Sequence, residues 1–174
     1  LETFRKNVKA FHAGLDALGV DRETMEIPYE NGHLNAIYYP APVGGESKPL
    51  IVACGGYDST MEELYFVIGA GALERGYPVL AYEGPGQGAA LREQGMKFTH
   101  EWEKPTGAVL DYFLECHEQP EKIILYGLSL GGYLAPRAAS RDDRIDGLIL
   151  NNHLYDMRAA ALQLIPSPVV SLYE

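Results

Sequence analysis

Ser129 has the neighbours that most directly indicate chemistry, because residues 127–131 read Gly-Leu-Ser-Leu-Gly and fit the pattern Gly-x-Ser-x-Gly. A β-branched and aromatic run at 122–126 precedes it and predicts a buried strand, whereas the Ala- and Leu-rich run at 130–140 predicts a helix. A tight turn between strand and helix holds a serine hydroxyl at the carboxyl edge of a sheet, beside backbone N–H groups that can stabilise an oxyanion. The alternative is a glycine-rich turn that carries a serine by chance.

The elements that must position this serine follow an alternating order of strand and helix. The expected elements in chain order are a helix at 4–18, a hairpin of strands at 25–29 and 33–39, a strand at 50–54, a helix at 62–75, a strand at 77–82, a helix that Pro105 opens, the strand at 122–126, the helix at 130–140, a strand at 145–150, and a helix at 154–164 that Pro166 and Pro168 break. Residues 83–88 are expected to form a loop, and the segment from there to Lys104 has no regular pattern. Alternation of this kind predicts a mostly parallel sheet with helices on both faces and ligands at the carboxyl ends of its strands.

Two local signals define the amino-terminal part. Asn31-Gly32 between the first two strands is typical of a hairpin turn. One apolar stripe (Phe4, Val8, Phe11, Leu15 and Leu18) marks the first helix, and Gly19 is its expected C-cap. The stripe can pack on the sheet or on another subunit, so a homodimer is permitted.

Composition excludes several classes of partner. The chain has 174 residues, with 24 acidic against 14 basic side chains and a formal charge of −10. This balance argues against nucleic acid and against an anionic membrane, since both require a basic face. We expect Cys54 and Cys116 to be buried free thiols, which fits a reducing, cytoplasmic setting. The five histidines have no metal-ligand spacing and 84–88 is no phosphate cradle, so no metal and no cofactor is expected.

Several further stretches resemble one branch of the α/β-hydrolase superfamily. They are residues 55–63, 73–77, 83–88 and 127–132, together with 102–103 and 110–112. The branch includes dihydroxypseudooxynicotine hydrolases, fermentation-respiration switch proteins and the fungal yellowish-green hydrolases of pigment polyketide pathways, and the resemblance extends from about Ile51 to Asp156. It implies a serine hydrolase that cleaves a carbon–carbon bond next to a ketone in an acyl-aromatic or polyketide substrate, or else an ester or a lactone.

The resemblance also implies roles for residues near the serine. Ser129 is the expected nucleophile, and the backbone N–H groups of Leu130 and Tyr57 are the expected oxyanion donors. The alternative for Tyr57 is a loop aromatic that packs on substrate or core. Asp58 is expected to hold or relay the proton that a leaving carbanion needs, or else to cap the following helix.

Other polar residues have weaker assignments. Glu62 and Glu63 are expected as first-turn acids that complement a helix dipole. Glu83 ends a strand and can contact substrate, although an orienting hydrogen bond within its loop is the preferred interpretation. His153 follows the strand at 145–150 and can contribute to the substrate pocket.

The chain departs from the family pattern after Ser129. A complete member supplies an acid and a histidine later in the chain, beyond an inserted helical cap. His153 is the only histidine after the serine in this sequence, and it is away from the usual position of the base. Among the acids after the serine, we expect Asp142, Asp143 and Asp146 at the wrong end of the sheet. Asp156 lacks a suitable partner. We therefore expect part of a longer hydrolase: an N-terminal helix at 1–20, a partial core at 21–153 and the start of a cap or lid at 154–174, with C-terminal strands and most of the cap missing. The remainder of that hydrolase is the expected partner at the exposed edge after the last strand.

Three functional alternatives remain at this point. The enzyme cleaves either a carbon–carbon bond or an ester or lactone with the same serine. A second class is a ligand-binding protein that keeps the scaffold without catalysis. A peptidase of the same fold is a third, weaker reading, since no residue favours a peptide substrate.

Overall fold

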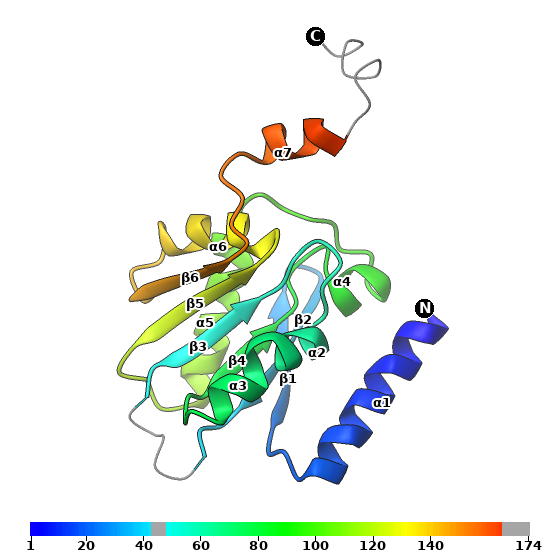
Figure 1. Cartoon of the computed structure of the whole chain (residues 1–174), viewed down its shortest axis with the longest axis vertical. Helices are drawn as coiled ribbons and strands as arrows, with labels where there is room; N and C mark the ends of the chain where they lie inside the picture. Colours follow the sequence, from blue (N-terminus) through cyan, green and yellow to red (C-terminus); the bar gives the residue numbers. More distant parts are fainter. Residues whose placement is uncertain (43–47, 165–174) are drawn as a thin grey trace.

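A six-stranded mixed sheet forms the centre of the computed structural model, which describes residues 1–42 and 48–164. Its strands are β1 (Glu23–Tyr29), β2 (Gly32–Tyr39), β3 (Leu50–Cys54), β4 (Val79–Tyr82), β5 (Ile123–Leu128) and β6 (Gly147–Asn151). Their order across the sheet is β1-β2-β4-β3-β5-β6 (Figure 1). The last four of these run parallel, and β2 pairs antiparallel with both β1 and β4. The expected mostly parallel sheet is confirmed.

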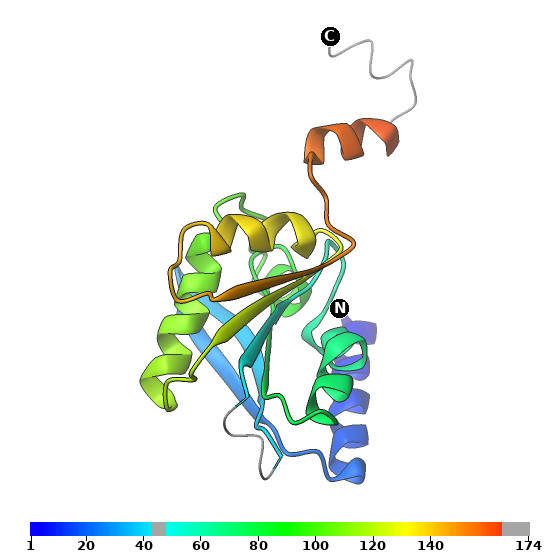
Figure 2. The same ribbon diagram turned by 60° about the vertical axis from the view of Figure 1, so that its left-hand side comes forward.

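The helices cover both faces of this sheet. They are α1 (Glu2–Leu18), α2 (Met61–Leu64), α3 (Ala70–Leu73), α4 (Gly88–Arg92), α5 (Glu103–Cys116), α6 (Gly131–Ala139) and α7 (Met157–Leu164), with a π-helical turn, Tyr65–Gly69, between α2 and α3. Figure 2 shows α5 and α6 on one side of the sheet and α1 and α3 on the other. α7 lies beyond the carboxyl ends of the parallel strands, apart from the sheet (Figure 1).

Alternate residues of the central strands feed two separate hydrophobic cores. Val52, Leu80 and Leu125 pack with α5 and α6, whereas Ala53 and Ala81 pack with α1 and the helical segment 61–73. All five side chains are fully buried, because successive residues of a strand point to opposite faces and both faces are covered. This two-sided burial explains why these strands are continuous apolar runs in the sequence.

The expected amino-terminal hairpin and helix cap are present, but the hairpin turn is displaced from its Asn31-Gly32 signal. Tyr29 of β1 pairs with Gly32 of β2, so the turn consists of Glu30 and Asn31, and Glu30 takes the positive φ of 49°. Gly19 ends α1 in the left-handed conformation, and its N–H donates to carbonyl groups of the last turn. The apolar stripe of α1 packs on its own chain through buried Leu15 and half-buried Phe11, while Leu18 remains exposed.

Four expectations about the elements are wrong. The helix at 62–75 is interrupted by the π-helical turn, and the segment after the 83–88 loop contains α4. α5 begins at Glu103, so Pro105 is its third residue rather than its first. Cys116 is exposed because it ends α5 beyond the residues that touch the sheet, whereas Cys54 is buried in β3.

Some expectations lie wholly or partly outside the described residues. Pro166 and Pro168 are among 165–174, and part of the loop expected after β2 is among 43–47. Within 1–42 and 48–164, none of the helices has both the length and the apolar character that crossing a membrane requires.

Candidate active site

Ser129 occupies a strained turn between β5 and α6. Its φ is +55°, one of three positive values at non-glycine residues in the described part of the chain. Such a conformation costs on the order of 1–3 kcal/mol and persists only where its surroundings enforce it. Two backbone bonds do so here: the Ser129 N–H donates to the Asn151 carbonyl at 2.9 Å, and the Gly132 N–H donates to the Ser129 carbonyl at 2.8 Å. The serine side chain is exposed at the carboxyl ends of the parallel strands.

The glycines around Ser129 allow strand and helix to approach closely. A Cβ atom on Gly127 would overlap the backbone of Gly131, and a Cβ on Gly131 would lie 2.7 Å from the carbonyl oxygens of Cys54 and Gly55. Atoms at those separations repel, so neither position accepts a larger residue without movement of α6. The two glycines therefore let β5 and α6 pass close to each other.

The loop after β3 lies against Ser129. A Cβ on Gly56 would stand 2.9 Å from the Ser129 Cβ and 3.2 Å from its Oγ. The fold therefore brings the serine beside the loop that carries Tyr57 and Asp58.

Several backbone N–H groups of the elbow and of the facing loop have no acceptor within the described residues. Those of Leu130, which precedes α6, and of Tyr57 are among them, and so are those of Gly131 and Asp58. The neighbouring Gly56 N–H differs, because it donates to the Ser59 Oγ at 2.8 Å. Free N–H groups at the start of a helix and on a facing loop are the arrangement that stabilises an oxyanion in acyl transfer.

The Tyr57 side chain packs on other loop aromatics. Its ring is 71% exposed and stacks on Phe98, with ring centroids 5.5 Å apart and planes 8° apart. Phe98 stacks in turn on Trp102, which is fully buried and donates its Nε1–H to the Tyr82 hydroxyl at 3.0 Å. The aromatic interpretation of Tyr57 describes its ring, and the expected oxyanion role concerns its backbone, so the two are compatible.

Asp58 does not cap the helix that follows it. Thr60 is the N-cap of α2, and its Oγ1 accepts from the Glu63 N–H at 3.4 Å. Asp58 lies two residues too early to reach that position; its side chain is exposed and makes no hydrogen bond within the described residues. The helix-cap alternative is wrong, and the carboxylate is free to act elsewhere in the loop.

Glu83 is buried rather than directed at a substrate. Only 1% of it is exposed, and its two oxygens accept from the N–H groups of Met61 at 3.1 Å and Ala89 at 2.7 Å. Burial raises the pKa of this carboxyl group to about 7; the charge of Glu62 adds to the effect, and the two N–H groups oppose it. Substrate contact by Glu83 is contradicted by this burial. The preferred expectation, an orienting hydrogen bond within its own loop, is also not met, because both bonds go to residues of α2 and α4 outside that loop.

His153 and the acids of the turn before β6 occupy different ends of the sheet. A Cβ on Gly132 would lie 2.8 Å from the His153 Cα, so the exposed histidine follows β6 beside the first turn of α6. Asp146, by contrast, accepts from the N–H of Ile123 at the start of β5, and Asp142 is ion-paired with Arg144 in the same turn. As expected, these acids are remote from the serine.

One buried polar residue near the site had no assigned role from sequence. Gln87 is 1% exposed; its Nε2 donates to the Gly55 carbonyl at 2.7 Å and to the Gly56 carbonyl at 2.9 Å. Glu62 lies in the first turn of α2 as expected, but it is only 3% exposed, and neither of its oxygens has a partner within the described residues. In the sequence, Gln87 is noticeable only as part of the 83–88 stretch on which the family resemblance rests. That stretch does not indicate which loop the Gln87 side chain contacts.

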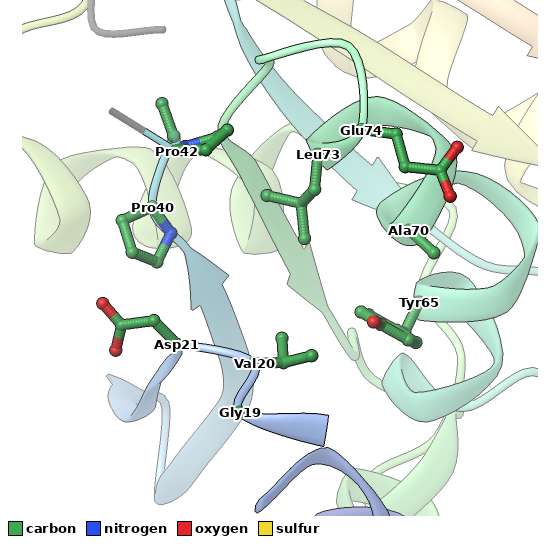
Figure 3. A pocket seen from close by; sticks show the side chains of 10 residues that line it. Gly19, Val20, Asp21, Pro40, Pro42, Tyr65, Ala70, Leu73 and Glu74 are labelled. Atoms are coloured by element: carbon green, nitrogen blue, oxygen red, sulfur yellow. The ribbon is translucent and has the colours of Figure 1, made fainter. Parts of the chain in front are cut away.

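One pocket of the described structure lies away from the serine. Figure 3 shows a cavity of about 460 Å³ between the end of α1, the segment after β2 and α3, lined by Val20, Pro40 and Leu73 among others. Tyr39 at the end of β2 pairs with Val79 at the start of β4, so this cavity lies at the amino ends of the parallel strands. Ser129 lies at the opposite edge. In the described ranges, no three His, Cys, Asp or Glu side chains gather as a metal site would require.

The sequence model of the Alpha/beta hydrolase family matches residues 50–170, which include the elbow and the facing loop. The chain belongs to the alpha/beta hydrolase family. Among relatives of this chain, LUC6 from Fusarium sp, named a hydrolase, is 41% identical over 150 residues, covering 80% of this chain and 35% of LUC6. FUS2 of Gibberella moniliformis, named 20-hydroxy-prefusarin hydrolase, is 37% identical over 177 residues, covering 96% of this chain and 42% of FUS2.

A solved structure agrees with this membership. The 2,6-dihydroxy-pseudo-oxynicotine hydrolase superposes with a TM-score of 0.70 and 27% identity, covering 82% of this chain and 40% of that protein. The expected resemblance to that branch and to fungal polyketide hydrolases is confirmed. This alpha/beta hydrolase chain spans less than half the length of the relatives it matches.

Proposed function

We propose that this chain is part of a serine hydrolase that cleaves a carbon–carbon bond next to a ketone in an acyl-aromatic or polyketide substrate, with Ser129 as nucleophile. The observation that carries the proposal is the exposed Ser129 at φ +55° in a turn between strand and helix, against the loop that carries Tyr57 and Asp58. The names of FUS2 and of the oxynicotine hydrolase support hydrolysis of small organic molecules rather than peptides.

The proposed reaction begins at the ketone carbonyl. The Ser129 Oγ adds to the carbonyl carbon while a base removes its proton, and the N–H groups of Leu130 and Tyr57 stabilise the resulting oxyanion. The carbon–carbon bond then breaks, and its electron pair leaves with the second fragment as an enolate-stabilised carbanion. Asp58 is proposed to hold or relay the proton that this fragment accepts. Water finally hydrolyses the acyl-serine and regenerates the hydroxyl.

The base and the acid that orients it are proposed to come from the remainder of the hydrolase. His153 lies near the elbow, and we assign it to substrate contact rather than to general base catalysis. This division predicts that the longer polypeptide is active and that the 174 residues alone are not. Full activity of a purified 19 kDa species, verified by mass measurement, would contradict it.

Substitution of the proposed nucleophile tests the function directly. In the full-length protein, Ser129→Ala should reduce hydrolysis by about 10⁴-fold or more and abolish labelling by a fluorophosphonate, because no other hydroxyl replaces the nucleophile. Product analysis by mass spectrometry separates the rival reactions, since a β-diketone loses an acyl fragment and an ester loses an alcohol. Absence of labelling in the complete wild-type protein would favour the ligand-binding alternative.

A further inference from the structure

The Gln87 side chain connects the loop after β4 to the loop that faces Ser129. Its Oε1 accepts from the Gly84 N–H at 2.9 Å within its own loop. Its Nε2 donates across to the Gly55 and Gly56 carbonyls, 32 and 31 residues away in sequence. Only this orientation of the amide satisfies all three partners, because a carbonyl cannot donate and an N–H cannot accept.

The bond to Gly56 has a consequence for the next N–H group. The described chain contains no cis peptide bond, so the carbonyl of Gly56 and the N–H of Tyr57 point in opposite directions across one planar peptide. Holding the carbonyl toward Gln87 therefore turns the Tyr57 N–H away from Gln87. Gly56 itself lies against the Ser129 side chain, so this peptide is adjacent to the proposed nucleophile.

The neighbouring bonds fix the remaining freedom of the loop. The Gly56 N–H is committed to Ser59, and Glu83 accepts the N–H of Met61 at the start of α2. Glu83 and Gln87 come from the same loop after β4. Together they hold the loop after β3 at both its ends, Gln87 at Gly55 and Gly56 and Glu83 at Met61. Rotation of the 56–57 peptide would break the Gln87 bond and leave a buried carbonyl without a partner.

We propose that Gln87 is a positioning residue that fixes the Tyr57 N–H in the direction required of an oxyanion donor. The proposal rests on the proposed function of Ser129. Gln87 itself touches neither substrate nor the serine; it acts through the peptide between Gly56 and Tyr57. A glutamine suits this position because one side chain supplies the acceptor that anchors it and the donor that holds the peptide.

The test uses three variants of the full-length protein. Gln87→Leu removes both functions of the amide, and Gln87→Asn keeps the amide but shortens its reach by one methylene. Thr106→Val is the matched control, since it removes another fully buried hydrogen bond, to the Tyr82 hydroxyl at 2.8 Å, which is made neither by Gln87 nor by Gly55 or Gly56. Rates are normalised to the folded fraction measured by circular dichroism, and Gln87→Asn carries the test if Gln87→Leu does not fold.

We expect kcat to fall on the order of 100-fold in Gln87→Leu and less in Gln87→Asn, with KM changed by less than about threefold. Affinity for a trifluoromethyl ketone, which forms an oxyanion with the serine, should fall in parallel, whereas Thr106→Val should lower only the melting temperature. Unchanged kcat and inhibitor affinity in both Gln87 variants would overturn the proposal. Activity retained by Ser129→Ala would instead overturn the proposed nucleophile, so the two failures are distinguishable.

Discussion

At the scale of single residues, the sequence patterns did not predict the burial of Glu62 and Glu83, the two acids near the loop after β4. Glu83 and Glu62 are both buried, and the charge of Glu62 helps to keep the pKa of Glu83 high. Two ionised carboxylates in this environment repel each other and lack water. The pair therefore favours the state in which Glu83 carries a proton.

Stability should accordingly decrease as the pH rises. The folded-state pKa of Glu83, about 7, lies above its ordinary value of 4.5, so its contribution is complete below pH 4.5 and is lost as the pH rises through 7. The shift corresponds to roughly 3 kcal/mol of unfolding free energy. Urea denaturation of the full-length protein between pH 5 and 8 measures it. The dependence of the unfolding free energy on pH should flatten in Glu83→Gln and persist in the exposed control Glu121→Gln. An equal dependence on pH in both variants would refute the assignment.

At the scale of elements, the close contact between β5 and α6 depends on glycines, because they have no Cβ atom. Gly127 and Gly131 let the helix start directly over the strand, and Gly131 touches the carbonyl groups at the end of β3. The same contact fixes the N–H of Leu130 next to the serine. The packing of α6 on the sheet and the proposed oxyanion site therefore both depend on the close approach of Gly131 to the end of β3.

A pair of glycine substitutions separates this contact from helix propensity. Gly131→Ala should destabilise the protein by about 1–3 kcal/mol and reduce kcat, because its Cβ would lie 2.7 Å from two carbonyl oxygens. Gly14→Ala is the control: it lies in α1 with no atom within 4 Å of the added Cβ, so it should stabilise by up to about 1 kcal/mol. Thermal denaturation and initial rates measure both, and a neutral Gly131→Ala would argue against the tight contact.

At the scale of the whole molecule, the two edges of the sheet differ. β6 is an edge strand with Leu148 38% and Ile149 45% exposed, and an apolar groove of about 680 Å³ runs from these residues to Ile68 and Ala72. An exposed apolar edge strand invites pairing with further chain. We expect the remainder of the longer hydrolase to cover it.

Hydrogen exchange tests that coverage. Amides of β6 should exchange at least tenfold more slowly in the full-length protein than in a 174-residue fragment, because an added strand or helix protects them. The matched reference is β3, which lies between β4 and β5 and should be protected in both. Equal exchange of β6 in the two proteins would mean that the groove stays open.

The sequence by itself determined the features that depend on neighbours along the chain. The elbow at Ser129, the hairpin of β1 and β2 and the cap at Gly19 are all set by local backbone preferences and by hydrophobic periodicity. These signals act within a few residues, so a single sequence contains them completely.

Only the tertiary structure decided the features that depend on residues far apart. The bonds of Gln87 to Gly55 and Gly56, the burial of Glu62 and the exposure of Cys116 follow from how loops and helices meet over the sheet. Periodicity identifies an apolar face but not the partner of a polar side chain, because that partner is fixed by packing geometry rather than by residue type. For the same reason, the local pattern around Ser129 identified a candidate nucleophile, while the group that orients the facing peptide became visible only in three dimensions.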